Sequence, residues 1–172
     1  ESLFKAGKYE ETVELLNEII GVDASSINAL KLMSKCMFAQ RRFNEARVYL
    51  NRILSIEPEN LESLKDLGNS YQLTGESNEA RKYYRKAVEI DDQYAPALTN
   101  LGILEVVNGE DKLGLSLLIK ATKVEPTLLA AWMNLGNSYL KIGKTEEAES
   151  SLRKVLEINP DIYQINMKLA GL

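Results

Sequence analysis

A period of 34 residues constrains the fold of this chain more than any other feature of its sequence. Leucine–glycine pairs recur with this spacing, and their glycines are Gly68, Gly102 and Gly136. Prolines and alanines fall on the same grid, at Pro58, Pro126 and Pro160 and at Ala46, Ala80 and Ala148. Equivalent positions in successive periods form columns, and columns that stay in register without an insertion indicate stacked copies of one structural unit rather than one irregular domain.

The pattern within one period predicts two helices. Between residues 61 and 74 the apolar residues mostly follow three- and four-residue steps, and Gly75 then favours a left-handed helix stop. Between residues 77 and 90 a second apolar stripe forms, while Glu79, Lys82 and Arg85 face away from it. Glu-Pro or Asn-Pro pairs end the second helix in other periods, because proline cannot continue a helix interior. Each period is therefore predicted to be an antiparallel helix pair.

The segment 129–160 resembles the tetratricopeptide repeat (TPR) family. It carries the family signature nearly whole, with Trp132, Leu135, Gly136, Tyr139, Gly143, Ala148 and Pro160. The resemblance extends over essentially the whole chain and implies an all-α fold, a right-handed α-solenoid of antiparallel helix pairs. We expect a single array over residues 1–172. Its expected parts are a partial repeat at 1–26, repeats at 27–60, 61–94, 95–128 and 129–162, and a partial or capping helix at 163–172.

The repeated columns also predict how the helices pack. Small residues let two backbones approach closely, and bulky residues fill the space beside them. Tyr84 and its counterparts are expected to lock one repeat to the next; the counterparts are Leu50, Leu118 and Leu152. Four residues depart from the family pattern: Arg41 stands in the turn-glycine column, Glu105 in the tyrosine column, and Ala24 and Asp92 in the proline column.

Composition excludes several classes of function. The net charge of −4 argues against a nucleic-acid or membrane-surface binder, which carries a basic excess. The absence of histidine removes histidine triads and imidazole metal sites, and a single cysteine excludes an internal disulfide or a thiolate zinc site. The glycines do not cluster into a phosphate-binding loop. The sequence therefore predicts no enzyme, no catalytic residue, no cofactor and no metal.

Two residues admit a functional and a structural interpretation. Cys36 is either a reactive thiol or an inert buried one, and its place on the apolar side of a helix without an adjacent base favours the second. Trp132 is either a platform for a ligand or a packing residue, and its position in a core column favours packing.

The two ends of the sequence bear on the origin, the location and the self-association of the chain. The chain lacks an initial methionine and starts partway through a predicted helix, so we expect a fragment of a longer protein. No apolar run approaches the ~20 residues of a membrane-spanning helix, and a cytoplasmic location is expected. We also expect self-association, or fraying of residues 163–172, because the terminal helices lack part of their cover. The apolar residues concerned are Val13, Leu16, Ile19, Ile20, Ile165, Leu169 and Leu172.

The TPR resemblance implies a concave groove lined by the first helix of each repeat. Its predicted residues are Lys31, Lys35, Lys65, Asn69, Gln72, Asn100, Ile103, Val106, Met133, Asn134, Asn137 and Lys141. Their character changes along the chain from lysine to asparagine to mostly apolar. The predicted partner is therefore a peptide or helix of another protein with an acidic part and an apolar part.

Part of this set resembles a known recognition device of the family. Lys65, Asn69 and Asn100 match the first part of the two-carboxylate clamp with which chaperone-binding TPR domains hold an acidic C-terminal tail. The clamp also requires basic residues where this chain has Ala130 and Asn134, so it is incomplete. Asparagine is also simply frequent at these places in the family, which is the structural alternative.

Two classes of function remain open. The first is a protein-interaction scaffold that binds a partner segment in the groove. The alternative is a substrate-guiding TPR arm of a larger enzyme, such as a glycosyl-, methyl- or sulfotransferase. RNA binding by the related 35-residue pentatricopeptide repeats is disfavoured by the strict 34-residue period and by the acidic charge.

Overall fold

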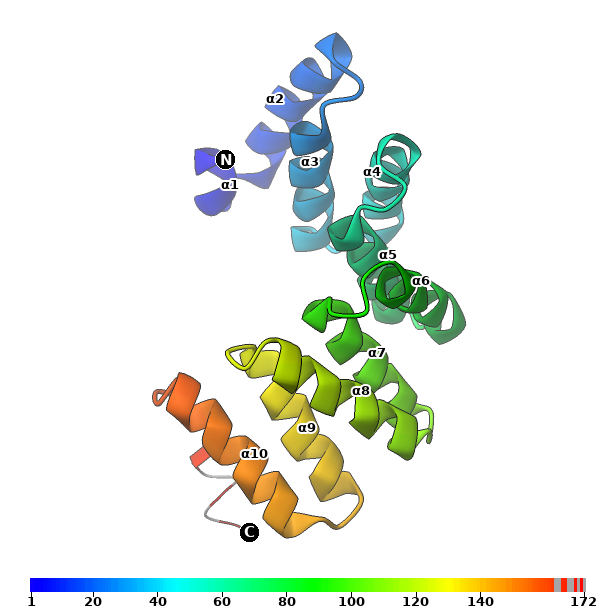
Figure 1. Ribbon diagram of the computed structural model, residues 1–172. Helices are drawn as coiled ribbons and strands as arrows, with labels where there is room; N and C mark the ends of the chain where they lie inside the picture. Colours follow the sequence, from blue (N-terminus) through cyan, green and yellow to red (C-terminus); the bar gives the residue numbers. More distant parts are fainter. Residues whose placement is uncertain (163–164, 167–168, 170, 172) are drawn as a thin grey trace. The chain divides into compact units, whose positions relative to one another are not determined.

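The computed structural model describes residues 1–162, 165, 166, 169 and 171, and the predicted capping helix at 163–172 lies largely outside them. The described residues contain ten α-helices and no strand (Figure 1). The helices are α1 (Ser2–Lys5), α2 (Tyr9–Val22), α3 (Ile27–Ala39), α4 (Phe43–Ile56), α5 (Leu61–Leu73), α6 (Ser77–Ile90), α7 (Ala95–Val107), α8 (Asp111–Val124), α9 (Leu129–Lys141) and α10 (Thr145–Ile158). The prediction of an all-α fold built from helix pairs is confirmed.

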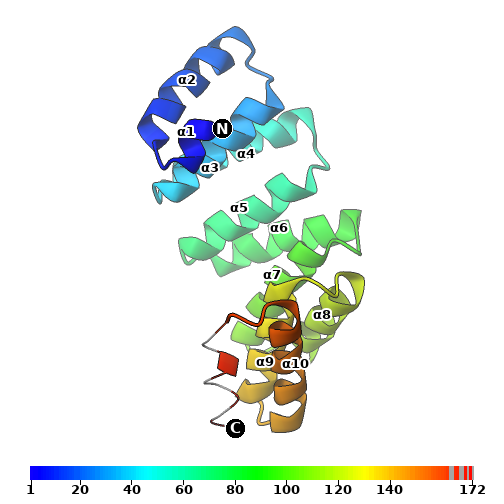
Figure 2. The ribbon, with the colours of Figure 1, turned by 90° about the vertical axis from the view of Figure 1, so that its left-hand side faces the viewer.

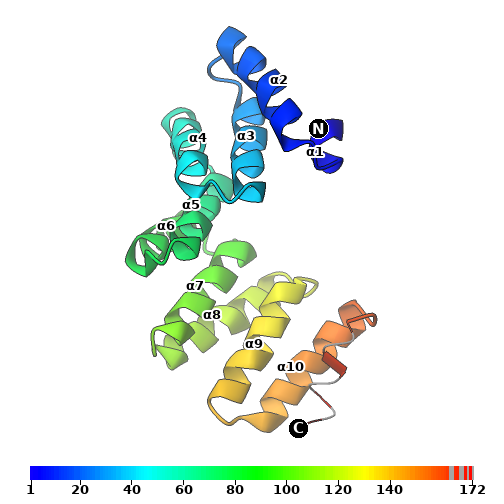
Figure 3. The same cartoon turned by 180° about the vertical axis from the view of Figure 1, so that it is seen from behind.

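The chain divides into two compact units, Glu1–Ile90 with α1 to α6 and Asp91–Leu172 with α7 to α10. In the first unit α3 pairs with α4 and α5 with α6, while α2 packs on α3 and α4 on α5. In the second unit α7 pairs with α8 and α9 with α10, and α9 also packs on both helices of the preceding pair. Figures 2 and 3 show the two helices of each pair side by side. Helices α3, α5, α7 and α9 begin where the repeats were expected to begin; the repeat boundaries themselves stay a prediction.

Two residues after the end of each first helix stands a residue with left-handed backbone geometry, which reverses the chain into the second helix. Glycine fills this place four times, for example Gly75 with φ of 83°, as the sequence predicted. The exception is Arg41, with φ of 59° in the turn between α3 and α4. A side chain in this region is disfavoured because its Cβ crowds the following carbonyl oxygen.

The helices of a pair approach so closely that a side chain is excluded at the glycine column. A Cβ atom on Gly68 of α5 would lie 2.3 Å from a ring carbon of Tyr84, and one on Gly136 of α9 would lie 2.8 Å from Leu152. Tyr84 and Leu152 are fully buried. Their counterparts also reach the next pair, since Leu118 packs with Leu135 of α9.

Replacing Gly68 by alanine tests this close approach. The added methyl group overlaps the buried Tyr84 ring, so we expect Gly68→Ala to lower the unfolding free energy by about 1–3 kcal/mol. Gly21 in α2 is the matched control, because a Cβ there meets nothing within 4 Å. Gly21→Ala should raise stability by about 0.4–1 kcal/mol, since alanine loses less backbone entropy on folding. Urea unfolding followed by circular dichroism measures both; equal midpoints would contradict the packing described.

Replacing Arg41 by glycine tests the turn. Glycine adopts the left-handed geometry freely, so Arg41→Gly should raise the unfolding free energy by about 1 kcal/mol. Gly143→Ala in the corresponding turn between α9 and α10 should lower it by a similar amount. Thermal unfolding by calorimetry distinguishes the two, and a loss of stability in Arg41→Gly would show that the arginine side chain has a role of its own.

Candidate functional site

The predicted groove residues lie on the first helices of the pairs, five in one unit and seven in the other. The first unit holds Lys31 and Lys35 on α3 and Lys65, Asn69 and Gln72 on α5. The second unit holds Asn100, Ile103 and Val106 on α7 and Met133, Asn134, Asn137 and Lys141 on α9. The clamp formed by Lys65, Asn69 and Asn100 draws on both units and stays a prediction.

In the first unit, one carboxylate bridges two of the predicted lysines. Glu62 at the start of α5 lies 3.1 Å from the ammonium nitrogen of Lys31 and 3.2 Å from that of Lys35, both on α3. Burial raises the pKa of Glu62, but hydrogen bonds from the two lysines outweigh it and hold the pKa below its usual value. The three side chains therefore carry one net positive charge, less than the sequence pattern of lysines suggested.

The same two lysines line a hollow of about 550 Å³ in the first unit. Asn28 and Leu32 of α3, Phe4 and Lys5 of α1, and Glu1 share its lining with them, and Glu1 pairs with Lys5 at 3.1 Å. Half of the Lys35 side chain is exposed. Ammonium groups, an amide and apolar groups thus face one hollow, an arrangement that can receive a carboxylate next to an apolar side chain. Phe4 and Lys5 are absent from the predicted groove residues, because they lie in the partial repeat at 1–26, for which the sequence predicted no groove residue.

The polar residues predicted on α5 are largely engaged inside the unit. The Tyr84 hydroxyl lies 2.8 Å from the side-chain oxygens of both Asn69 and Gln72. Burial raises the pKa of Tyr84, so its hydroxyl remains a hydrogen-bond donor at neutral pH. Lys65 pairs with the adjacent Asp66 at 2.9 Å. Asn69 and Gln72 therefore help to satisfy a buried phenol, a structural role that only the tyrosine at position 84 creates.

In the second unit, Val106 is a core residue rather than a groove residue. Its side chain is only 6% exposed and packs with Leu118 and Leu135. The reason is Gly114 of α8, which brings that helix so close that a Cβ on it would lie 2.4 Å from Val106. The neighbouring Val107 is instead 71% exposed.

The other predicted residues of the second unit are partly accessible. Ile103 and Met133 are half-buried against the core, and the Asn134 amide donates to its own helix at the Ala130 carbonyl, 2.8 Å away. The ammonium of Lys141 donates to the Val106 carbonyl at 2.5 Å and pairs with Asp111 at 2.9 Å. Lys141 thereby stabilises the C-terminal end of α7, where a positive charge complements the helix dipole.

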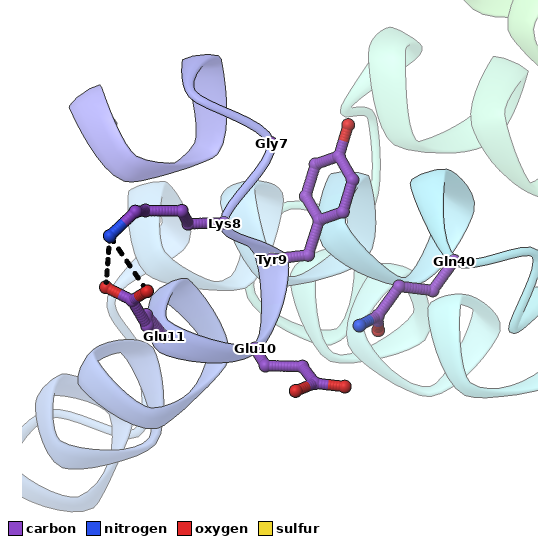
Figure 4. A pocket seen from close by; sticks show the side chains of 6 residues that line it. All are labelled: Gly7, Lys8, Tyr9, Glu10, Glu11 and Gln40. Atoms are coloured by element: carbon purple, nitrogen blue, oxygen red, sulfur yellow. Dashed lines mark hydrogen bonds and ion pairs between the residues drawn. The ribbon is translucent and has the colours of Figure 1, made fainter.

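A smaller hollow of about 300 Å³ lies at the start of α2 (Figure 4). Lys8, Tyr9 and Glu10 line it together with Gln40. The ammonium of Lys8 is directed to Glu11, 3.0 Å away, and not to Gln40. Its polar groups do not converge on a common point, so this hollow is not a candidate site.

Cys36 and Trp132 both pack against the apolar core, as the sequence predicted. Cys36 is fully buried, and burial raises the pKa of its thiol. Trp132 packs between two core clusters, and its indole N–H donates to the Pro126 carbonyl at 2.9 Å.

The apolar residues of α2 that were expected to lack cover differ in exposure, since Leu16 is buried whereas Ile19 is 48% exposed. Ile165 is buried with Leu152 and Val155, and self-association through the ends stays a prediction.

The described residues offer neither a cluster of metal ligands nor a membrane-spanning helix. No group of three or more Asp, Glu, Cys or His side chains is placed to hold a metal ion. None of the described helices combines the length and the apolar character that crossing a membrane requires.

Comparisons with known proteins agree with this architecture. A family model described as tetratricopeptide repeat matches residues 129–162, and another with the same description matches residues 3–67 and 37–102. A comparison with curated protein sequences finds no match.

Several solved structures share the fold at low sequence identity. TTC0263, a TPR protein of Thermus thermophilus, is 20% identical, with a TM-score of 0.80 over 99% of this chain and 93% of that one. MamA from Desulfovibrio magneticus RS-1 is 17% identical, with a TM-score of 0.76 over 94% and 92%. YrrB, described as a TPR protein with an unusual peptide-binding site, is 21% identical, with a TM-score of 0.71 over 99% and 87%.

The raised pKa of Cys36 has a consequence for stability in mild alkali. Above the ordinary thiol pKa of about 8.5 the unfolded chain loses the proton while the folded chain keeps it, so stability falls as pH rises. We therefore expect the unfolding free energy to decrease as the pH rises above about 8.5. Cys36→Ala should not show this slope. Urea titrations across this range measure it, and alkylation of the folded thiol as fast as that of the unfolded chain would contradict the burial.

Proposed function

Because the chain belongs to the tetratricopeptide repeat family, we propose that it is a protein-interaction scaffold whose first helices hold a short segment of a partner protein. The proposal includes a peptide or helix as the ligand and a binding role rather than a catalytic one. The peptide-binding site named in the description of YrrB supports this class of ligand.

The observation that carries the proposal is the hollow lined by Lys5, Lys31 and Lys35 together with Phe4 and Leu32. A carboxylate of the partner would be met by ammonium groups there, and an adjacent apolar side chain by the leucine and phenylalanine. Glu62 competes for the ammonium groups of Lys31 and Lys35, and Glu1 competes for that of Lys5, so both carboxylates reduce the affinity for an acidic ligand. Charges of this kind act mainly through orientation and association rate.

The second unit offers candidate contacts of its own, the exposed Val107 and the half-buried Ile103 and Met133. Apolar contacts there would prolong the lifetime of a complex. The predicted division into four full repeats and two partial ones is part of this proposal. The alternative of a substrate-guiding arm in a larger enzyme would use the same surface, and it stays a prediction, as does a cytoplasmic location.

The test begins with capture of partners on the immobilised chain and their identification by mass spectrometry. A Lys31→Glu/Lys35→Glu double variant should lose partners that use the proposed surface. Lys82→Glu/Lys154→Glu is the charge-matched control, because these exposed lysines lie on the second helices α6 and α10. Loss of the partners in the control alone would assign binding to the other side of the helix pairs.

Two neutral substitutions then give opposite expected effects on a peptide from the captured partner. Lys35→Gln should weaken binding, whereas Glu62→Gln should strengthen it, because it frees both ammonium groups. Each change should be up to about fivefold, the range of a partly exposed ion pair, and should shrink at high salt. Isothermal titration calorimetry measures both; a weaker Glu62→Gln complex would contradict competition by Glu62.

A further inference from the structure

A hollow of about 650 Å³ in the second unit lies apart from the predicted groove residues. The residues that line it come from α8, α9, α10 and the α8–α9 connection, and none of the described ones is among the twelve predicted for the groove. Figure 3 shows α9 beside α8 and beside α10. Its lining is mainly aromatic and aliphatic, with Ile119, Trp132, Leu135 and Tyr139, and with Thr122 and Ser151 beside them.

The first unit fills the corresponding place with its own side chains. Tyr71, which stands 68 residues before Tyr139, is stacked on Tyr83, with ring centroids 5.4 Å apart and ring planes at 8°. Arg47 also covers the Tyr71 ring, with its guanidinium carbon 3.7 Å from the centroid. Leu54 packs against the same core cluster as both tyrosines.

In the second unit the counterparts of two of these residues are small. By the same shift of 68 residues, Ser151 takes the place of Tyr83 and Thr122 that of Leu54. Both hydroxyls are already satisfied, since Ser151 donates to the Glu147 carbonyl at 2.8 Å and Thr122 to the Ile119 carbonyl at 2.9 Å. The hollow therefore suits an apolar or aromatic ligand group better than a polar one.

The rim of the hollow carries both signs of charge. Lys123 stands on α8, and Glu146 and Glu147 stand in the first turn of α10. Lys144 pairs with Glu147 at 2.9 Å and lies 5.9 Å from the centre of the Tyr139 ring. Lys123 and Glu146 thus offer a donor on one helix and an acceptor on another. A peptide backbone, with its N–H donors and C=O acceptors, suits such a rim better than a charged small molecule.

We propose that this hollow is a second binding site, which takes a phenylalanine or tyrosine side chain from a segment of a partner protein. The inserted ring stacks on Tyr139 as Tyr83 stacks on Tyr71 in the first unit, and it packs beside Trp132. Stacked rings at such spacing attract one another beyond the effect of buried area. The site shares no residue with the proposed groove, so each of the two proposals can be correct when the other is wrong.

The probe is N-acetyl-phenylalaninamide, with N-acetyl-leucinamide as the aliphatic control. Trp132 is the single tryptophan of the chain and lines the hollow, so its fluorescence reports occupancy when excited where phenylalanine does not absorb. We expect a saturable change with a dissociation constant on the order of 1 mM for the phenylalanine probe. Binding of the leucine probe should be about tenfold weaker.

Three variants of the full chain locate the binding. Ser151→Tyr supplies the ring that Tyr83 supplies in the first unit, so it should abolish the saturable change and raise the thermal unfolding midpoint. Thr122→Leu fills the hollow without a new ring and should weaken binding about tenfold. Ser116→Tyr on the exposed side of α8 is the matched control and should bind like the unaltered chain.

The proposal is overturned if the unaltered chain shows no saturable change, or if Ser151→Tyr and Thr122→Leu bind the probe as tightly as it does. Sedimentation supplies a further check. A concentration-dependent dimer of the unaltered chain that disappears in Ser151→Tyr would mean that a second copy covers the hollow, and this too would overturn the assignment to a partner protein.

Discussion

The two helices of a pair approach so closely that the first helix has no room for a side chain where the second helix crosses it. At Gly68 this space belongs to the ring of Tyr84, and at Gly136 to Leu152. The large residue is fully buried in both cases. This contact fixes which face of the first helix is covered by its own partner, and so determines which residues remain for contact with other proteins.

Similar helix pairs carry different surfaces in the two units. In the first unit α3 and α5 carry charged residues, and Glu62 of α5 pairs with Lys31 and Lys35 of α3. In the second unit α7 is buried on almost every side, down to Val106. A repeat fold therefore constrains function little, since binding is decided by substitutions at positions that the packing leaves free.

The two proposed sites illustrate this, and each lies in a different unit. The lysine-lined hollow is built by α1 and α3, whereas the aromatic hollow lies where α8, α9 and α10 meet. The first depends on charges that water and salt screen, and the second on the missing ring at Ser151.

The sequence by itself determined the helices, their ends and their turns. The 34-residue period placed the starts of α3, α5, α7 and α9, and the glycine column located all but one of the left-handed turns. It also identified Cys36 and Trp132 as packing residues. These features follow from backbone geometry and side-chain size, which act within one helix or between neighbours in the chain.

Only the tertiary structure decided which candidate residues a partner could reach. Gly114 draws α8 over Val106, and the phenol of Tyr84 engages Asn69 and Gln72. The pairing of Glu62 with lysines about one repeat earlier likewise depends on how near α3 lies to α5. A period states which residues are equivalent but not how close two helices come, and a side chain's exposure and partners depend on that distance.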